Sequence, residues 1–244
     1  MDTMHAPSLA VAAERRAVII GASLAGLMAA RVLSAHYAEV VLLERDPLPG
    51  AGAPRKGTPH AVHPHGLLAR GRQAIEELFP GFTEALQTQG ALVGDIGTDI
   101  AVDANRARLA RQPAGIMGLA ASRLAIEAEV RRRVRTLPCV QVLDETNVES
   151  PVFADGRVTG VRFSRRNSSG ASETLAAALV LDCTGRGSHS PAWLVNWGFD
   201  APFEERVPIG LAYTSAYFRR DGTATPPISC VVGPPRRPCH GRRS

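Results

Sequence analysis

One stretch near the N-terminus, residues 16–46, constrains the fold of this chain more than any other. The apolar run Ala17–Ile20 is short, rich in β-branched residues and free of charge, as expected of a strand buried on both faces of a parallel sheet. It ends at a glycine turn, Gly21-Ala22-Ser23-Leu24-Ala25-Gly26, and a helical pattern follows. A second apolar run, Glu39–Leu43, then ends on Glu44. This order predicts a strand, a helix and a second, parallel strand.

The same stretch has the features of a dinucleotide-binding unit. Gly21 allows a tight turn out of the first strand, and Gly26 lets the helix pack close to that strand. The start of the helix offers backbone N–H groups and partial positive charge to a pyrophosphate. Glu44 lies 18 residues beyond Gly26, near the spacing at which a carboxylate accepts hydrogen bonds from ribose hydroxyls and repels a 2′-phosphate. We therefore expect FAD or NAD, rather than NADP, as the tightly bound ligand.

Ser23 stands where the dinucleotide fingerprint has its middle glycine. Serine is small enough for the backbone to approach a phosphate, and we expect its hydroxyl to offer that phosphate a further hydrogen bond. An ordinary strand–helix–strand turn with no ligand is the alternative interpretation of the same residues.

The net charge of +5 does not indicate a nucleic-acid partner. Residues 235–244 contain four arginines and no acid, and the remaining chain has 24 basic against 23 acidic residues, with no basic stripe of the kind that binds nucleic acid. Residues 1–15 lack the uninterrupted apolar segment of a signal peptide, and no apolar run approaches the length of a membrane span. The four cysteines have no C-x-x-C spacing and suit reduced thiols. We expect a cytoplasmic protein.

Three histidines, His60, His63 and His65, fall within six residues and raise the question of a metal site. No carboxylate or cysteine lies among them, and Pro64 disfavours a pair of ligands on one helix. We therefore predict no metal site, and interpret these histidines as part of a loop that packs against the protein or lines a cofactor groove.

Helical spacing of apolar residues recurs at three places after this loop. It predicts helices over residues 67–79, 82–89 and 120–134. The third has Ser122 as its expected N-cap, and Arg131 to Arg133 on a solvated face at its C-terminal end, where cations suit the helix dipole.

From residue 140 onward the apolar period changes to two, which indicates strands. The pattern predicts a strand over 140–143, a hairpin over 152–163 around the turn Asp155-Gly156, and a strand over 175–181. That last strand runs into Asp182-Cys183-Thr184-Gly185-Arg186-Gly187-Ser188. The glycines there favour a second place where backbone approaches a cofactor, and a plain turn at the end of a strand is the alternative.

With these motifs in order, the chain resembles the FAD-dependent aromatic hydroxylases and epoxidases, the flavoprotein monooxygenases of the para-hydroxybenzoate hydroxylase type. The resemblance spans about residues 16–220. Four groups of residues carry it: the glycine turn with Glu44; Arg55 with the following Gly57-Thr58-Pro59-His60 and His65-Gly66-Leu67-Leu68; Asp155-Gly156; and Asp182 to Ser188.

The resemblance implies FAD as the cofactor and assigns roles to single residues. The glycine turn would contact the pyrophosphate, Glu44 the adenosine ribose, and Arg55 and Arg123 the region of the phosphates. Asp155-Gly156 would correspond to the family's DG motif, which is associated with both FAD and NADPH. No residue presents itself as catalytic. The predicted cofactor-binding residues are Gly21, Ala22, Ser23, Leu24, Ala25, Gly26, Glu44, Arg45, Arg55, Arg123, Asp155, Gly156, Thr184 and Gly185.

The function that the resemblance implies is an NAD(P)H-dependent oxygenation. In the family, transient NADPH or NADH reduces FAD, and the reduced flavin then uses O₂ to hydroxylate or epoxidise an aromatic, polyketide or isoprenoid small molecule of secondary metabolism. Two alternatives remain on the residues alone. One is a flavin- or NAD-dependent reductase or dehydrogenase that does not use O₂, and the other is a non-catalytic nucleotide-binding remnant.

The expected fold is α/β, with a Rossmann-like FAD/NAD(P)-binding domain and part of a β-rich substrate domain. We expect the FAD-binding domain at residues 16–198, with 91–118 inserted into the substrate-side sheet, and the partial substrate domain at 199–232. Residues 1–15 are expected to be a flexible N-terminus and 233–244 a disordered basic tail.

Members of this family are longer, and carry a Gly-Asp motif beyond the part that this sequence matches. No such segment follows residue 220 here. We therefore expect a truncated reading frame or a fragment.

Overall fold

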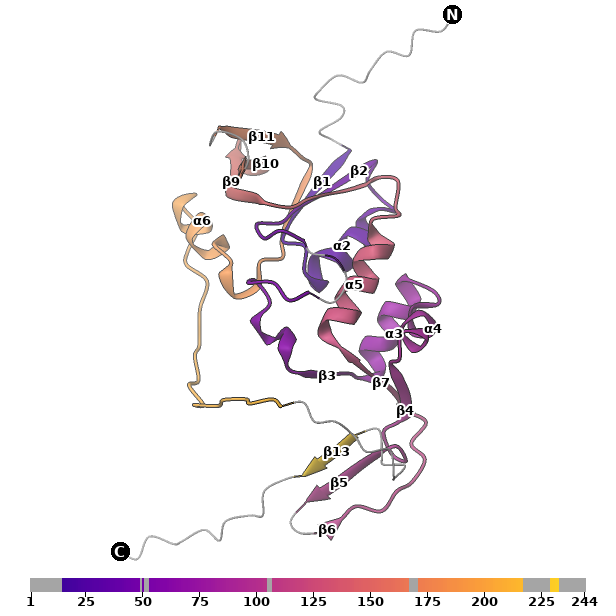
Figure 1. Cartoon of the computed structure of the whole chain (residues 1–244). Helices are drawn as coiled ribbons and strands as arrows, with labels where there is room; N and C mark the ends of the chain where they lie inside the picture. The colour runs from indigo at the N-terminus through magenta and orange to yellow at the C-terminus, as the bar shows by residue number, and fades with distance from the viewer. Residues whose placement is uncertain are drawn as a thin grey trace, which may run out of the picture. The chain divides into compact units, whose positions relative to one another are not determined.

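A computed structural model of the chain describes residues 15–48, 50, 53–104, 107–166, 171–216 and 229–232 (Figure 1). The chain divides into two compact units, Met1–Val62 with Arg123–Tyr213, and His63–Ser122 with Thr214–Ser244. These bounds differ from the domains expected from the sequence, because residues 63–122 leave the first unit and return to it. The sequence assigned only 91–118 to such an insertion. The predicted N-terminal segment and basic tail lie almost wholly outside the described residues.

The first unit is built on a four-stranded parallel sheet of order β12-β1-β2-β8. Its strands are β12 (Leu179–Asp182), β1 (Arg16–Ile20), β2 (Glu39–Leu43) and β8 (Val140–Leu143), and α2 (Leu24–Leu33) connects β1 to β2. The βαβ unit predicted from the sequence is therefore confirmed, and so is the α/β fold class.

The apolar runs at β1 and β2 form the core of this sheet because both faces of each strand are covered. Residues 17–20 and 40–43 are all buried. Two helices, α2 and α5 (Arg123–Val134), lie side by side on the sheet (Figure 1). The other face carries a cluster in which Val18 and Ile20 pack with Val161 and Phe163.

Val161 and Phe163 belong to a second, antiparallel sheet of order β11-β10-β9. Its strands are β9 (Thr146–Ala154), β10 (Arg157–Arg165) and β11 (Ser172–Ala176). Asp155 and Gly156 form the turn between β9 and β10 with φ values of 51° and 75°. Positive φ at both central residues is the signature of a tight hairpin turn. The hairpin predicted from Asp155-Gly156 is confirmed.

The single strand predicted over 175–181 is in fact two strands. β11 ends at Ala176 in the antiparallel sheet, and β12 begins at Leu179 in the parallel sheet. Ala177 and Ala178 carry the chain from one sheet to the other. The run is apolar throughout because both sheets face the same core, so its hydropathy does not reveal the break.

The second unit contains two three-stranded sheets and a helix pair. One sheet, of order β3-β7-β4, is antiparallel; the other, of order β13-β5-β6, pairs β13 parallel to β5. Two helices begin later than the sequence predicted, because the residues before them pair as strands. α3 starts at Ala69 instead of residue 67, and α5 of the first unit starts at Arg123 instead of residue 120. The elements are β3 (Pro64–Leu67), α3 (Ala69–Leu78), α4 (Phe82–Thr88), β4 (Leu92–Asp95), β5 (Ile100–Ala104), β6 (Ala107–Arg108), β7 (Met117–Ser122) and β13 (Ser229–Val232).

The described part of the first unit also contains the 3₁₀ turns η1 (Pro59–Val62) and η2 (Gly185–Gly187), and the helix α6 (Ser190–Asn196). After α6 the described residues 199–216 form neither helix nor strand. In the described part of the chain, no helix has the length and apolar character that a membrane crossing requires.

Candidate functional site

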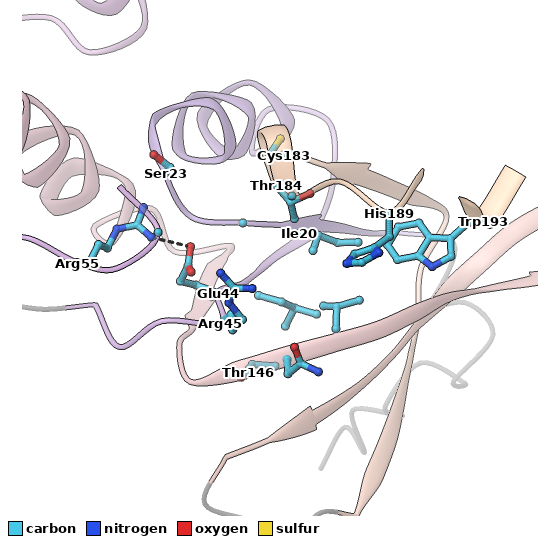
Figure 2. A pocket seen from close by; sticks show the side chains of 16 residues that line it. Ile20, Ser23, Glu44, Arg45, Arg55, Thr146, Cys183, Thr184, His189 and Trp193 are labelled. Atoms are coloured by element: carbon cyan, nitrogen blue, oxygen red, sulfur yellow. Dashed lines mark ion pairs between the residues drawn. The ribbon is translucent and has the colours of Figure 1, made fainter. Parts of the chain in front are cut away.

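A cavity of about 180 Å³ opens at the carboxyl ends of β1, β2 and β12 in the first unit (Figure 2). Ile20 and Leu43, the last residues of β1 and β2, line it together with Cys183 and Thr184, which follow β12. Ligands of open α/β sheets bind at this edge, because the loops that leave the strands converge there. The position of the cavity therefore makes it the candidate functional site.

The glycine turn is shaped by two close backbone approaches. Gly21 has φ +99°, and a Cβ there would lie 2.9 Å from the carbonyl oxygen of Cys183. A Cβ at Gly26 would overlap the carbonyl oxygen of Gly21 and press on Ile19. Both glycines are thus required by the turn itself, and the predicted roles of tight turn and close helix packing are seen directly.

Glu44 is buried at the end of β2, where its carboxylate lines the cavity. One oxygen accepts the backbone N–H of Ala22 at 2.9 Å, and the other accepts that of Asp46 at 3.0 Å. The first oxygen also lies 3.2 Å from a guanidinium nitrogen of Arg55. Glu44 therefore joins the glycine turn to the loop after β2.

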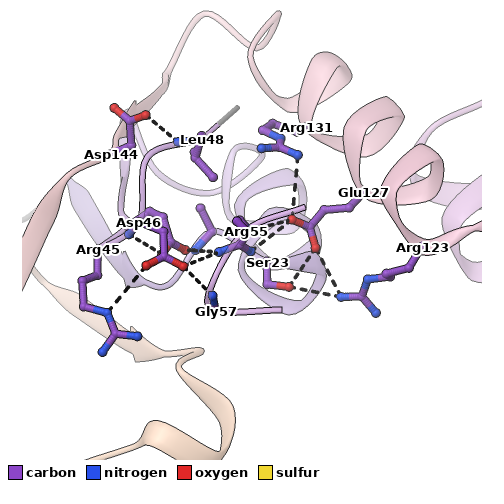
Figure 3. Close-up of polar contacts among 12 residues, drawn as sticks. Ser23, Arg45, Asp46, Leu48, Arg55, Gly57, Arg123, Glu127, Arg131 and Asp144 are labelled. Atoms are coloured by element: carbon purple, nitrogen blue, oxygen red, sulfur yellow. Dashed lines mark hydrogen bonds and ion pairs between the residues drawn. The ribbon is translucent and has the colours of Figure 1, made fainter. Parts of the chain in front are cut away.

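Arg55 is the centre of a buried ion network drawn in Figure 3. Its side chain is only 6 % exposed and lies within ion-pair distance of three carboxylates: Glu44 at 3.2 Å, Asp46 at 3.8 Å and Glu127 at 3.0 Å. Asp46 in turn accepts the backbone N–H of Gly57 at 2.6 Å. Arg55 lines the cavity, but most of its hydrogen-bonding capacity is engaged within the protein.

Glu127 and Arg131, both buried on α5, were not identified from the sequence. Arg131 was expected on a solvated face, which is wrong: its side chain is 8 % exposed and lies 3.8 Å from Glu127. Burial lowers the pKa of Arg131, and the charge of Glu127 opposes that shift. The available signal was helical spacing, because Glu127 and Arg131 adjoin the apolar stripe Ile126, Val130 and Val134.

The hydroxyl of Ser23 faces α5 (Figure 3). It donates to Glu127 at 2.9 Å and accepts from Arg123 at 3.1 Å. A serine hydroxyl has one proton to donate, so in this arrangement that proton is not directed to a phosphate. The hydrogen bond from Ser23 to a phosphate stays a prediction, and Ser23 does line the cavity.

A much smaller cavity of about 10 Å³ lies behind Arg55 and is also lined by Arg123, Glu127 and Arg131. That volume is close to the minimum that holds one water molecule. Among the described residues, two buried nitrogens, Arg123 Nε and Arg131 Nη1, have no hydrogen-bond partner. Arg123 does not line the main cavity, but it contacts Ser23, which does.

The loop after β12 is organised by Asp182. Its carboxylate accepts the backbone N–H of Thr184 at 2.9 Å and the hydroxyls of Ser188 and Ser190, each at 2.6 Å. Partial burial by itself would raise the pKa of Asp182, but the hydrogen bonds from Ser188, Ser190 and Thr184 outweigh it and hold the pKa below its ordinary value of 3.8. Burial and the charge of Asp182 raise the pKa of the neighbouring Cys183 thiol.

One side of the cavity is apolar and aromatic, and sequence reasoning did not find it. His189 and Trp193 lie beside each other across the cavity from Arg55 (Figure 2). A neighbouring cavity of about 220 Å³ shares Trp193 with the first and is also lined by Trp197, which stacks on Phe153 with ring centroids 4.6 Å apart. In the sequence, only the position of His189 and Trp193 after the glycine-containing loop 182–188 pointed to this part of the site.

The structure brings together only part of the predicted set. Asp155 and Gly156 lie in the β9–β10 turn and are not among the residues that line the cavity, nor is Gly185. Ala22, Leu24, Ala25 and Gly26 form the turn and the start of α2 behind it. The predicted residues that do line the cavity are Gly21, Ser23, Glu44, Arg45, Arg55 and Thr184.

His63 and His65, two of the three histidines before α3, each have a polar contact with another residue. His63 Nδ1 lies 2.8 Å from the hydroxyl of Ser215, and His65 Nδ1 lies 2.8 Å from the carbonyl oxygen of His63. Within the described ranges, no three His, Cys, Asp or Glu side chains gather into a potential metal site.

Comparison with known proteins places these features in a family. Residues 17–196 match the model of the FAD dependent oxidoreductase family. Protein Rv3254 of Mycobacterium tuberculosis is 38 % identical over 215 residues, which cover 83 % of this chain and 44 % of that protein. The matched family segment contains the glycine turn, Glu44 and the loop after β12.

Solved structures share the fold at low identity. PqsL, a probable FAD-dependent monooxygenase from Pseudomonas aeruginosa, matches with a TM-score of 0.59 at 17 % identity, over 80 % of this chain and 48 % of PqsL. The p-nitrophenol 4-monooxygenase PnpA from Pseudomonas putida matches with a TM-score of 0.52 at 18 % identity, over 72 % of this chain and 42 % of PnpA. The chain spans less than half the length of these relatives. It belongs to the FAD dependent oxidoreductase family.

Proposed function

We propose that this chain binds FAD in the cavity at the carboxyl ends of β1, β2 and β12, as the FAD-binding part of an NAD(P)H-dependent flavoprotein monooxygenase. The observation that carries the proposal is the convergence of three elements on one sheet edge. The glycine turn and Glu44 come from one βαβ unit, the loop held by Asp182 comes from a distant part of the sequence, and all three line or frame a single cavity.

The residues at this edge fit a flavin dinucleotide. The glycine turn leaves backbone at the start of α2 where a pyrophosphate binds, and Glu44 supplies the carboxylate for ribose hydroxyls. Arg45 supplies a cation, since its side chain is 68 % exposed and its nearest carboxylate oxygen, on Asp46, is 3.9 Å away. The cavity is smaller than the roughly 300 Å³ of a small ligand site, so the described residues enclose only part of the dinucleotide.

FAD would supply the redox chemistry, including reaction with O₂ after reduction by NADPH or NADH. The chain's own residues would bind and orient it. Ile20, Leu43 and Trp193 contribute apolar side chains to the lining, which would keep water from a bound ligand. No described side chain stands out as an acid or base for the reaction, so the chain's contribution in this proposal is positioning and exclusion of water.

The substrate class in this proposal is a small aromatic, polyketide or isoprenoid molecule that is hydroxylated or epoxidised. PqsL is a probable FAD-dependent monooxygenase and PnpA is a p-nitrophenol 4-monooxygenase, which supports an oxygenase over a reductase. A reaction that consumes a reduced nicotinamide also suits the cytoplasm, the compartment we propose.

The first test is the visible spectrum of the purified chain with and without added FAD. Flavin bands that remain with the protein through gel filtration would support the proposal, and flavin that separates entirely from the protein would contradict it. With flavin bound, NADPH and NADH oxidation would then be followed together with oxygen consumption. Oxygen uptake that depends on an aromatic substrate distinguishes the monooxygenase from a reductase that does not use O₂.

Glu44→Ala gives the matched variant for this test. We expect it to weaken FAD binding by roughly 1–3 kcal/mol, because charged hydrogen bonds to ribose and to the glycine turn are lost together. Glu39→Ala is the control, since Glu39 lies at the other end of β2 and pairs with Arg16 at 2.7 Å. Flavin fluorescence titration gives both affinities, and equal losses in the two variants would contradict the assigned role of Glu44.

A further inference from the structure

Glu127 is a buried carboxylate that the proposed function does not yet use. It lies in the middle of α5, and its side chain is 7 % exposed. Both of its oxygens are engaged: one faces Arg55 and Arg131, and the other faces Ser23 and Arg123. A buried ion network of this kind is weak evidence for stability, because removing charges from water costs about as much as pairing them returns. Its arrangement around the cavity is more informative.

Glu127 does not line the main cavity, but it holds two residues that do. Ser23 and Arg55 both border that cavity, and both direct polar atoms backward to Glu127 (Figure 3). These two partners lie 104 and 72 residues away from it in the sequence. Glu127 is therefore a second link, beside Glu44, between the glycine turn and the loop after β2 that carries Arg55.

The contact with Ser23 fixes the start of α2. Ser23 precedes the first residue of that helix, and its hydroxyl proton goes to Glu127 at 2.9 Å. Arg123, one turn before Glu127 on α5, donates to the same hydroxyl at 3.1 Å. The direction of the backbone N–H groups at the helix start depends on where this residue is held.

The contact with Arg55 fixes the plane of its guanidinium. Nε and Nη2 lie 3.2 Å and 3.0 Å from one oxygen of Glu127, while Nη1 lies 3.2 Å from Glu44 on the other side. A planar guanidinium held at both edges has little freedom to rotate. These contacts hold Arg55 in one orientation at the cavity.

We propose that Glu127 is a positioning residue for the pyrophosphate of the bound dinucleotide, acting through Ser23 and Arg55. The inference rests on the proposed function, and names the residue that sets the geometry of the phosphate subsite. It is distinct from a role in ribose recognition, which belongs to Glu44. Ligands with and without the pyrophosphate therefore separate the two roles.

The test compares ADP with adenosine on the full 244-residue chain, each as a competitor of FAD in a fluorescence titration. Glu127→Gln keeps the shape of the side chain but replaces one carboxylate oxygen with a donor that faces Arg55 or Ser23. We expect ADP and FAD to bind about tenfold more weakly, the equivalent of one lost hydrogen bond. Adenosine affinity should change less than about twofold on the same reasoning.

Glu129→Gln is the matched control. Glu129 lies two residues further along α5 and is equally buried, with Arg132 at 2.8 Å and Arg133 at 2.7 Å. None of these three residues borders the cavity. Its substitution should lower thermal stability as Glu127→Gln does, yet leave the ratio of ADP to adenosine affinity unchanged.

Ser23→Ala completes a double-mutant cycle. If Glu127 acts through Ser23, the two substitutions together should weaken ADP binding less than the sum of their separate effects. Should Glu127→Gln fail to fold, Glu127→Asp takes its place, since it keeps the charge but withdraws the carboxylate from Ser23. Unchanged ADP affinity in both Glu127 variants, or an equal loss for ADP and adenosine, would overturn the inference and leave FAD binding intact. A wild-type chain that binds neither FAD nor ADP would overturn the proposed function and this inference with it.

Discussion

At the scale of single residues, Gly21 is a position in the site where a side chain is poorly tolerated. Its φ of +99° lies in the left-handed region, and any Cβ would stand 2.9 Å from the Cys183 carbonyl oxygen. We expect Gly21→Val to abolish FAD binding and to lower the free energy of unfolding by at least about 2 kcal/mol, because a β-branched side chain is strained there and clashes with the loop after β12. Flavin fluorescence titration and thermal melts measure the two effects.

Gly66→Ala is the control for that prediction. Gly66 lies in β3 in the second unit, outside the left-handed region, and a Cβ there would have no neighbour within 4 Å. We expect FAD affinity to stay at the wild-type value. If Gly21→Val binds FAD with the affinity of the wild type, the glycine turn is not part of the FAD site.

Residue roles set by local spacing could be predicted from the sequence, and those set by distant partners could not. Gly21 and Glu44 belong to one βαβ unit, whose parts lie within about 30 residues, and both line the cavity. Glu127 depends on Arg55, 72 residues away. A glutamate on a helix otherwise indicates a solvated face. The pairing of Ser23 with α5 is long-range in the same way, so its hydroxyl was expected to face a phosphate.

At the scale of elements, the loop after β12 makes the stability of the fold depend on pH through Asp182. The pKa of Asp182 is lower in the folded chain than its ordinary value of 3.8, so its hydrogen bonds stabilise the fold fully above that value, and the contribution is lost as the pH falls below it. We expect Asp182→Asn to be less stable than wild type near neutral pH, with the difference shrinking below about pH 4. Urea unfolding from pH 3 to 7 measures this, and a difference that does not change with pH would contradict it.

The β9–β10 turn gives a second prediction at this scale. Gly156 has φ +75°, and a Cβ there would meet nothing within 4 Å. Gly156→Ala should therefore cost about 1 kcal/mol of stability through backbone strain alone. FAD affinity should not change, because the turn does not border the cavity. A loss of FAD affinity in Gly156→Ala would instead support the cofactor role that the resemblance implied for Asp155-Gly156.

Elements with one clear period were predictable, and their junctions were not. β1, α2, β2 and the hairpin turn follow the sequence closely because each has an unambiguous pattern and a turn residue at its end. Residues 175–181 were expected as one strand because hydropathy does not distinguish two sheets that share a core. The crossing at Ala177 and Ala178 is fixed by pairing with β10 on one side and β1 on the other.

At the scale of the whole molecule, the described segment after α6 exposes large apolar side chains in alternation. Phe203 is 92 % exposed, and Val207, Ile209, Leu211 and Tyr213 are each more than half exposed. Apolar surface of this extent favours association. We expect the 244-residue chain to self-associate as its concentration rises, and Ile209→Ser with Leu211→Ser to reduce that association in light scattering. Leu109→Ser, at an exposed leucine in the second unit, is the control; a wild-type chain that stays monomeric would contradict the prediction.

The pairing of β1 with β12 also determines when the edge of the parallel sheet can form during synthesis of the chain. These strands pair directly, although 159 residues separate Ile20 from Leu179. At about 5–20 residues per second, roughly 8 to 30 seconds pass on the ribosome between the appearance of the first strand and that of its partner. Throughout that interval the glycine turn exists without the loop that faces it. If FAD needs both the glycine turn and this loop, it would bind only after β12 has been synthesised.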